Sequence, residues 1–214
     1  MSGVRLCLSA RTVGYPSAMA DELADYRRKR DTARSGEPSG SRRRGSKKES
    51  VFVVQRHDAS TLHFDFRLQI GDVLVSWAVP KGPSLDPRDK RLAAMTEDHP
   101  LDYADFEGRI GEGYGAGTVV VWDTGGFENI TEKKGEPVSA EDALAAGHLK
   151  FVLHGQKLTG AFALTHTKMG GDDKNWLLVK IDDEDADRRR KPATTQPESV
   201  LSGKTNEDFE GPGS

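Results

Sequence analysis

The 214-residue sequence contains a single cysteine, Cys7, and this scarcity limits the chemistry that the chain can use. One cysteine excludes an internal disulfide and any zinc site built from several cysteines. A metal ion bound by this protein must therefore take histidine and carboxylate ligands. We expect no role for Cys7 itself.

Long apolar runs are also missing. No run approaches the length needed to cross a bilayer, and the first residues lack the uninterrupted apolar stretch of a secretory signal. We therefore expect a cytoplasmic protein. With 35% hydrophobic and 30% charged residues, the composition is typical of one soluble domain with polar extensions.

Two common motifs of nucleotide-dependent and acyl-transfer enzymes do not occur. The glycine-rich segment 111–117 does not match Gly-x-Gly-x-x-Gly at a strand-to-helix turn, and it lacks the Lys-Ser/Thr ending of a P-loop. It predicts instead a tight loop that enters a strand at 118–122. No Gly-x-Ser-x-Gly elbow is present. The sequence therefore argues against a P-loop ATPase and against a serine hydrolase.

The net charge of −3 hides an uneven distribution. From Tyr26 to Lys48 ten Lys or Arg residues stand against only Asp31 and Glu37, whereas acidic residues gather at 182–187. Basic clusters such as 27–30 and 42–44 suit the neutralisation of nucleic-acid phosphates, but charge runs are also often merely solvated. Composition alone leaves both interpretations open.

From Val51 onward the pattern predicts an all-β domain. Short runs of strand-forming residues alternate with turn signals at 71–72, 125–126 and 155–156. About eight short strands with closely spaced turns favour a small antiparallel β-barrel or a sandwich, with one or two short helices. The expected strands are Val51–Arg56, Thr61–Ile70, Val73–Val79, Leu92–Glu97, Gly117–Asp123, Leu149–His154, Gly160–Thr167 and Trp176–Ile181.

One helix is predicted at Ala140–Ala146, because Ser139 is a suitable N-cap and Gly147 stands where a helix should end. We expect four segments along the chain. Residues 1–18 form an irregular extension, and Met19 is an alternative start. Residues 19–50 form a basic arm, residues 51–181 form the β domain, onto which part of the arm folds, and residues 182–214 form a charged tail.

The strongest functional signal is Leu-His-Phe-Asp-Phe-Arg-Leu at 62–68. Alternate side chains of a strand point to opposite faces, so one face is apolar and suits a core. The other face carries His63, Asp65 and Arg67, and His57 lies six residues upstream of His63. Two histidines and one aspartate make a metal-ligand set, with Arg67 as a fixed cation beside it. The alternative is a solvated strand face. The apolar face comprises Leu62, Phe64, Phe66 and Leu68.

A second polar set lies between 79 and 103. Arg91, Glu97 and His99 are odd-numbered positions of one extended stretch and should share a face unless a bulge intervenes. Lys81 sits in a stiff Pro-Lys-Gly-Pro loop, and Tyr103 follows His99 by four residues. Together with Arg67, these cations suit a phosphate clamp around the metal. An exposed ion-pair network is the alternative.

The motifs that contain these polar residues resemble those of a known family. Segments 55–67 (Gln-Arg-His-Asp-Ala-Ser-Thr-Leu-His-Phe-Asp-Phe-Arg), 76–84 (Ser-Trp-Ala-Val-Pro-Lys-Gly-Pro-Ser) and 97–103 (Glu-Asp-His-Pro-Leu-Asp-Tyr) are similar to the 3′-phosphoesterase domain of bacterial DNA ligase D. So are 90–93, 107–108, 114–118, 121–123, 147–151 and 153–155, in the same order, and the resemblance runs from about Leu23 to Thr205. One departure is the loop Ile110-Gly-Glu-Gly-Tyr-Gly115, which lacks the family's proline and is one residue shorter.

The resemblance implies a small β-barrel with a manganese-dependent site that removes 3′-phosphates and 3′-terminal ribonucleotides from DNA. The 3′-hydroxyl that remains serves non-homologous end joining. By this match His57, His63 and Asp65 hold the metal. The remaining site residues implied by the match are Arg67, His99 and Tyr103 at the scissile phosphate, Lys81 and Arg91 as assisting cations, Gln55 and Glu97 as supporting groups, and Arg30, Asp31 and Glu37 from the N-terminal segment.

The resemblance also implies partners. No ligase or polymerase module is present, so we expect a monomeric, stand-alone, nucleoid-associated member that acts on DNA or RNA-tipped DNA ends beside Ku, a separate DNA ligase and a polymerase. Two other functions stay open from the residues: a non-catalytic DNA-end-binding module, and a metal phosphoesterase for a small phosphorylated molecule. Either His99 or Tyr103 is a candidate to protonate the leaving oxygen.

Overall fold

The computed structural model describes residues 23–30, 32–40, 50–111, 113–167 and 171–210. Cys7, the extension 1–18, the alternative start at Met19, Asp31 and the basic run 42–48 lie outside these residues. Within them, no helix has the length and apolarity needed to cross a membrane.

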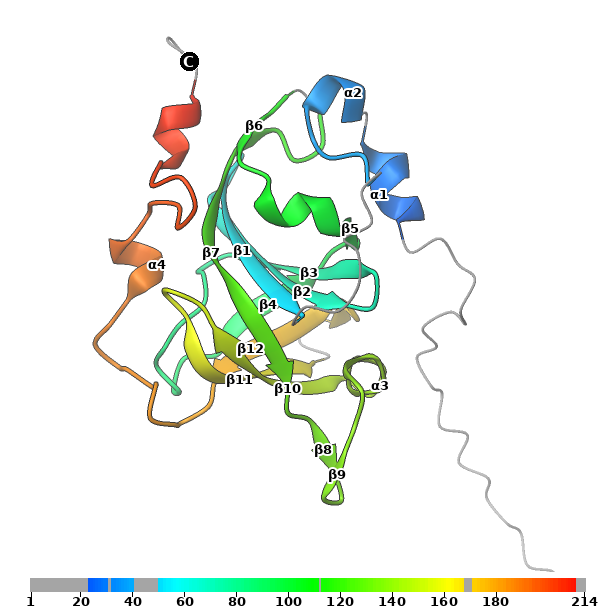
Figure 1. Cartoon of the computed structure of the whole chain (residues 1–214), viewed down its shortest axis with the longest axis vertical. Coiled ribbons are helices and arrows are strands. Elements are labelled where there is room, and N and C mark those ends of the chain that lie inside the picture. Colours follow the sequence, from blue (N-terminus) through cyan, green and yellow to red (C-terminus); the bar gives the residue numbers. More distant parts are fainter. Residues whose placement is uncertain (1–22, 31, 41–49, 112, 168–170, 211–214) are drawn as a thin grey trace, which may run out of the picture.

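Eight antiparallel strands close into a barrel (Figure 1). Neighbours in the wall are hydrogen-bonded in the order β1-β2-β3-β4-β12-β11-β10-β7, and β7 pairs back onto β1. The predicted barrel is confirmed, and each of the eight predicted strands overlaps one strand of the wall. Their bounds are β1 (Val51–Asp58), β2 (His63–Ile70), β3 (Val73–Val79), β4 (Arg91–Met95), β7 (Gly117–Asn129), β10 (His148–His154), β11 (Thr159–His166) and β12 (Asn175–Lys180).

Smaller elements surround the barrel. The predicted helix appears as α3 (Ala140–Ala145), and the Ser139 side chain accepts a hydrogen bond from the backbone N–H of Asp142 at 3.0 Å, as an N-cap does. The loop predicted at 111–117 does enter β7. The other elements are α1 (Ala24–Lys29), α2 (Thr32–Ser35), β5 (His99–Pro100), the 3₁₀ helix η1 (Leu101–Asp105), β6 (Gly108–Ile110), β8 (Glu132–Lys133), β9 (Glu136–Pro137), α4 (Pro192–Thr195) and the 3₁₀ helix η3 (Asn206–Phe209).

The barrel interior is filled with aromatic side chains. Phe66 lies 6.4 Å from Trp77 and 5.9 Å from Phe151 between ring centroids, and all three rings are fully buried. Phe64 and Leu68 point to the same interior, as the alternation predicted. Leu62 does not, because β2 begins only at His63 and the Leu62 side chain remains 37% exposed.

One turn prediction is wrong. Gly125 and Gly126 lie inside the long strand β7, which pairs with β1 up to Gly126 and with β10 from Gly126 onward. A Cβ atom on Gly125 would stand 2.1 Å from the carbonyl oxygen of His154. Glycine is therefore needed here for the close approach of two strands, and not for a chain reversal.

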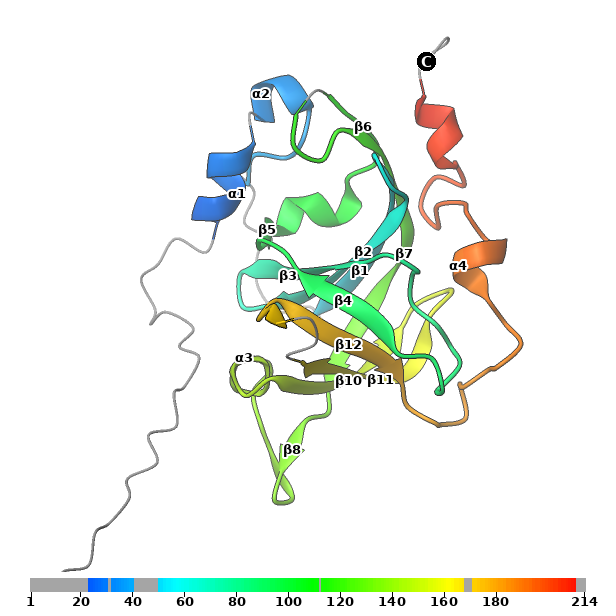
Figure 2. The same cartoon turned by 180° about the vertical axis from the view of Figure 1, so that it is seen from behind.

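A second apolar cluster forms on the outer side of the wall. Tyr26 of α1 and Tyr103 of η1 pack there against Val53 of β1 and Leu74 of β3. Figures 1 and 2 show α1 and α2 on one side of the barrel and the segment from α4 to η3 on the opposite side. The wall formed by β1, β2 and β3 is thus buried on both faces.

The segment expected as a charged tail lies along β1 and β7. The backbone N–H of Val200 donates to the carbonyl oxygen of Val121 at 3.0 Å. The side-chain nitrogen Nδ2 of Asn206 donates to the carbonyl oxygens of Arg56 at 3.1 Å and Thr118 at 2.6 Å. Asn206 is 1% exposed. These contacts fix the C-terminal segment against β1 and β7.

Candidate functional site

Polar side chains of β1 and β2 lie together on the outer face of the wall. His57 pairs directly with His63, and Gln55 pairs with Asp65. Opposite residues of an antiparallel pair point to the same side, so these four side chains share one face. Ala78 of β3 lies opposite Asp65 and continues the row. Strand register alone therefore brings the two histidines to the carboxylate.

His57, His63 and Asp65 form a cluster whose ligand atoms all lie within 4.8 Å of one another. Nε2 of His57 is 2.9 Å from the carbonyl oxygen of Gly115, and Nδ1 of His63 is 2.8 Å from that of Thr61. A ring nitrogen beside a carbonyl oxygen carries the proton, so the other nitrogen of each ring keeps its lone pair.

The two lone-pair nitrogens face Asp65. Nδ1 of His57 is 3.4 Å and Nε2 of His63 is 3.7 Å from the carboxylate oxygens. Hydrogen bonds from the outer nitrogens to backbone carbonyls are the usual way in which proteins orient metal-binding histidines. The donor set therefore fits a divalent transition metal such as manganese, iron or zinc.

Asp65 is ionised although it is buried. Burial raises the pKa of its carboxyl group, but the Arg67 guanidinium together with His57 and His63 outweighs this effect and holds the pKa well below its usual range. Nη2 of Arg67 lies 3.1 Å from Oδ2 of Asp65. The carboxylate is thus charged at neutral pH and ready to bind a cation.

Arg67 is 2% exposed and is held on every side. Its Nε donates to Gln55 at 2.9 Å, and its Nη1 lies 2.8 Å from Oγ of Ser76 and 2.9 Å from Nδ1 of His99. With the bond to Asp65, three of the five guanidinium N–H groups donate, to Gln55, Ser76 and Asp65. Nδ1 of His99 also lies 2.9 Å from the carbonyl oxygen of Glu97 and carries its own proton, so it is not counted as an acceptor. Arg67 therefore positions Asp65 and keeps donors for a phosphate oxygen.

His99 and Tyr103 lie beside this arginine. Burial and the charges of Arg67 and Arg30 lower the pKa of His99 well below its usual value, so the imidazole is neutral at pH 7. The hydroxyl of Tyr103 donates to Glu37 at 2.9 Å. Burial and the Glu37 charge raise the pKa of Tyr103 well above its usual value, so the phenol keeps its proton.

Charge pairs tie the N-terminal segment to the site. Nε of Arg30 lies 2.9 Å from Glu37, and its Nη1 contacts Glu97. Lys29 binds the second oxygen of Glu97 at 2.9 Å. The side chains of Arg30, Glu37 and Glu97 are 7%, 1% and 2% exposed, so each charge depends on its partners. Nη2 of Arg30 also lies 3.3 Å from Nε2 of His99.

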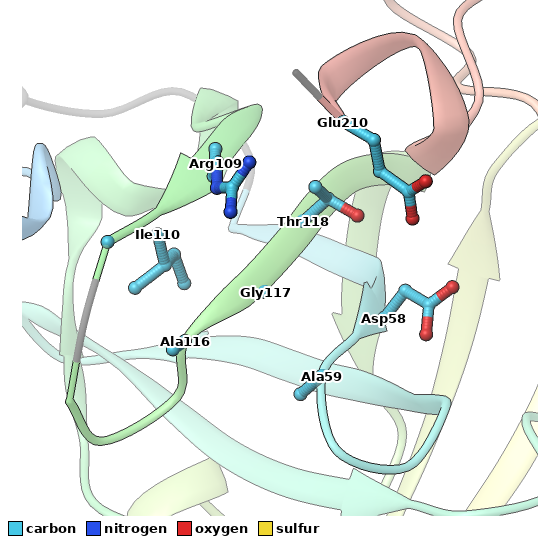
Figure 3. Close-up of a pocket in the computed structure, with 9 residues that line it drawn as sticks. Asp58, Ala59, Arg109, Ile110, Ala116, Gly117, Thr118 and Glu210 are labelled. Carbon is cyan, nitrogen blue, oxygen red and sulfur yellow. The ribbon is translucent and has the colours of Figure 1, made fainter. Parts of the chain in front are cut away.

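These groups surround a cleft of about 390 Å³. A second hollow of about 330 Å³ adjoins it and shares the walls Ala59, Ile110 and Ala116. Figure 3 shows the second hollow, into which Asp58 and Glu210 bring carboxylates and Arg109 brings a guanidinium. The predicted site residues that line the first cleft are Arg30, His57, His63, Asp65, Arg67, Glu97, His99 and Tyr103.

Gln55 and Glu37 do not line the cleft. They accept hydrogen bonds from two residues that do, Arg67 and Arg30 respectively. Lys81 is exposed in the turn after β3 and does not line the cleft. Arg91 pairs across the sheet with Leu178, a core residue, and bonds Asp89 at 2.8 Å.

The shared face expected for Arg91, Glu97 and His99 is wrong. Ala94 lies opposite Ala78, which lines the cleft, so Arg91, an odd number of positions away, points to the other side of β4. The chain then leaves β4 after Met95 and re-enters the sheet at His99. The regular alternation is lost between the two strands.

Several groups of the site had no signal in the sequence. Ser76 is one, and its position opposite Arg67 on β3 explains its contact. The Gly115 carbonyl that orients His57 is a second, and it belongs to the glycine-rich loop. Lys29 and Tyr114 are others, since Tyr114 lines the cleft and Lys29 contacts both Glu97 and the Tyr114 ring. Only the folded arrangement reveals them.

Comparisons with known proteins agree with this site. The family model for the DNA ligase D 3′-phosphoesterase domain matches residues 55–166. The chain is 48% identical over 190 residues to the multifunctional non-homologous end joining protein LigD of Pseudomonas aeruginosa, covering 86% of this chain and 21% of that protein. It is 40% identical over 167 residues to the LigD protein of Mycolicibacterium smegmatis, covering 78% of this chain and 21% of that protein.

The non-homologous end joining DNA repair protein LigD of Mycobacterium tuberculosis is 42% identical over 164 residues, which are 76% of this chain and 20% of that protein. The chain thus spans about a fifth of the length of these relatives. The matched region contains His57, His63, Asp65, Arg67 and His99. This chain belongs to the DNA ligase D 3′-phosphoesterase domain family.

Proposed function

We propose that this protein is a manganese-dependent phosphoesterase that cleans DNA 3′ ends. It removes 3′-phosphates and 3′-terminal ribonucleotides and leaves a 3′-hydroxyl for non-homologous end joining. The observation that carries the proposal is the pair of histidines whose free nitrogens both face an ionised Asp65. The family and its relatives, whose names refer to end joining, support the assignment to DNA ends.

The metal is held by Nδ1 of His57, Nε2 of His63 and the carboxylate of Asp65. A divalent cation bound there neutralises charge on the phosphoryl group and lowers the pKa of a water molecule. Manganese suits two imidazoles and one carboxylate, and the family resemblance selects it over iron or zinc.

Arg67, Arg30 and His99 form the phosphate-binding side of the cleft. The two guanidiniums stabilise charge that develops on the phosphoryl oxygens, and their mutual contacts with His99 fix its ring. The neutral imidazole of His99 has one N–H, on Nδ1, which lies 2.9 Å from the carbonyl oxygen of Glu97, and its Nε2 lies 3.3 Å from Nη2 of Arg30 and accepts from it. His99 therefore acts at the phosphate through Arg30, whose guanidinium it orients. Tyr103 acts as a positioning residue, because its hydroxyl is engaged by Glu37.

Lys81, exposed in the turn after β3, acts from outside the lining of the cleft on the extra negative charge of a terminal phosphomonoester. Arg91, which points to the other side of β4 and bonds Asp89, supports this part of the barrel without contacting the phosphate. Gln55 and Glu97 position Arg67 and Arg30, and Asp31 belongs to the same N-terminal segment. In the cell the protein acts as a cytoplasmic monomer on nucleoid DNA ends, beside Ku, a DNA ligase and a polymerase.

The direct test uses metal-depleted protein and added MnCl₂. Matched duplexes end in a 3′-phosphate, a 3′-ribonucleotide or a 3′-hydroxyl deoxynucleotide, and products are read by length and end chemistry. We expect conversion of the first two to shorter or dephosphorylated 3′-hydroxyl ends. A His63→Ala variant is the matched control, because His63 is partly exposed and its loss should spare the fold.

Two outcomes contradict the proposal. Tight binding of DNA ends without turnover under any divalent metal would indicate an end-binding module. Hydrolysis of small phosphate esters with no action on DNA would indicate a small-molecule phosphoesterase. Normal manganese-dependent turnover by His63→Ala would remove His63 from the metal site.

A further inference from the structure

Tyr114 is an unusual residue at the rim of the metal cleft. Its side chain is 57% exposed, the largest exposure among the large hydrophobic residues that the structure describes as exposed. It nevertheless lines the cleft that contains His57, His63 and Asp65. Because the ring is not buried against the core, it is accessible to a ligand that enters the cleft.

The backbone around Tyr114 holds the ring at this place. Gly113 has φ +115° and Gly115 has φ +81°, conformations that side-chain-bearing residues rarely adopt. The carbonyl oxygen of Gly115 receives the hydrogen bond from His57. The residue next to Tyr114 is therefore tied to a proposed metal ligand, and the position of the ring is coupled to the metal centre.

Two cations contact the same ring. Nζ of Lys29 lies 5.1 Å and the guanidinium carbon of Arg30 lies 5.4 Å from its centroid. Both cations belong to the end of α1 and also bind Glu97. A ring with adjacent cations beside a phosphate site is the arrangement with which proteins hold single nucleotides, because the cations attract the backbone while the ring stacks on a base.

The other end of the cleft is less suited to a nucleic-acid strand. There the adjoining hollow carries two carboxylates, from Asp58 and Glu210, and one guanidinium, from Arg109 (Figure 3). Carboxylates repel a phosphate backbone. The charges of the described residues therefore favour an approach of the strand past Lys29, Arg30 and Tyr114.

We propose that Tyr114 stacks on the terminal base of the DNA strand and so places the 3′-phosphate over the metal site. The inference rests on the proposed function and adds to it a base contact that does not depend on base identity. Every base has an aromatic face, so the contact is expected to strengthen binding to all 3′ ends rather than to select a sequence.

The test compares a 3′-phosphate duplex that has a normal terminal base with one whose terminal nucleotide is abasic. Tyr114→Ala is expected to raise KM on the normal end about tenfold, with kcat at saturation nearly unchanged, because stacking contributes about equally to ground and transition states. Tyr114→Phe should stay within about twofold of the wild type, since the ring is kept. On the abasic end, wild type and Tyr114→Ala should have equal KM.

Leu201→Ala is the matched control, because Leu201 is 51% exposed and does not line the cleft. It should leave KM unchanged on both ends. Equal increases in KM on normal and abasic ends for Tyr114→Ala would overturn the stacking inference and assign Tyr114 to the positioning of Lys29 or of the loop. An unchanged KM on the normal end would also overturn it.

A binding measurement separates this inference from the proposed function. A duplex with 2-aminopurine as the terminal base should lose fluorescence when it binds wild-type protein or Tyr114→Phe, but not when it binds Tyr114→Ala at saturating concentration. If the wild type shows no hydrolysis, the proposed function fails, and the quenching still decides the base contact. If the wild type hydrolyses the end but quenches no more than Tyr114→Ala, only the stacking inference fails.

Discussion

The two faces of β2 are both buried, but one packs in the apolar core and the other makes polar contacts in the candidate site. On the inner face Phe64, Phe66 and Leu68 make contacts in which volume and shape matter. On the outer face Asp65 and Arg67 are 8% and 2% exposed, and each buried polar group is stabilised by specific partners. Arg67 donates hydrogen bonds to Asp65 and to Gln55. A residue on the inner face can be exchanged for another of similar size, whereas one on the outer face leaves a charge or a hydrogen-bond donor without its partner.

The largest effect is expected on the outer face. Asp65→Asn keeps the size of the side chain but removes the charge that binds the metal. We expect both activities to fall by about 10³-fold, since a charge that stabilises the reacting group is lost. The melting temperature should also fall, because the buried Arg67 loses its ionic partner, but the protein should remain folded. Turnover near the wild-type rate would contradict the metal assignment, and global unfolding would show that Asp65 is needed for the fold instead.

The inner face should respond in the opposite way. Phe66→Ala removes a fully buried ring that contacts Trp77 and Phe151, and it should lower the free energy of unfolding by about 3–5 kcal/mol. The rate per folded molecule should change less than threefold. Denaturant unfolding combined with active-site titration measures both quantities. A loss of activity as large as that of Asp65→Asn would show that the two faces are not independent.

An intermediate effect is expected at Glu97, which links α1 to the barrel. Burial raises the pKa of Glu97, but hydrogen bonds from Arg30 and Lys29 outweigh it and lower the pKa below the usual 4.5. A carboxyl group whose pKa is lowered by folding stabilises the protein above the unfolded pKa, and this stabilisation is lost as the pH falls through the folded value.

We therefore expect Glu97→Gln to destabilise the protein at pH 7 by about 3 kcal/mol, because it leaves Arg30 buried without one partner. The difference from the wild type should begin to shrink as the pH drops below about 4.5, where the carboxyl group of the unfolded chain takes up a proton, and should disappear only below the lower pKa of the folded protein. Urea unfolding of both proteins across this range measures the effect. A difference that is independent of pH would mean that the charge of Glu97 does not stabilise the fold.

The smallest effect is expected outside the cleft. Lys81→Ala should lower 3′-phosphate removal by about tenfold or less, and ribonucleotide trimming by less than that, because a monoester carries more charge than a diester. Arg91→Ala should change both rates by the same small factor, since Arg91 faces away from the cleft. Rates on matched duplexes decide the point. Equal losses for Lys81→Ala on both substrates would make Lys81 a general phosphate contact or a structural residue.

The metal-ligand residues of the site could be predicted from the sequence. The contacts that the N-terminal segment makes with the site could not. His57, His63 and Asp65 follow from strand alternation and a short hairpin, both of which are local. The contacts of Arg30 with Glu97 and His99 join residues 67 and 69 positions apart. No local pattern encodes such pairs, and only the family resemblance pointed to Arg30 and Glu37.

The sequence by itself determined an all-β domain of about eight strands and the polar face of β2, because the alternation of side chains along a strand is a property of the extended backbone. The pattern left a barrel and a sandwich open. The N-cap of α3 was equally local. Tertiary structure decided that Gly125 and Gly126 continue a strand, that Arg91 faces away from His99, and that the Gly115 carbonyl orients His57. Each of these depends on which distant strand or loop packs alongside, and that is settled only when the barrel closes and α1 and η1 cover its outer wall.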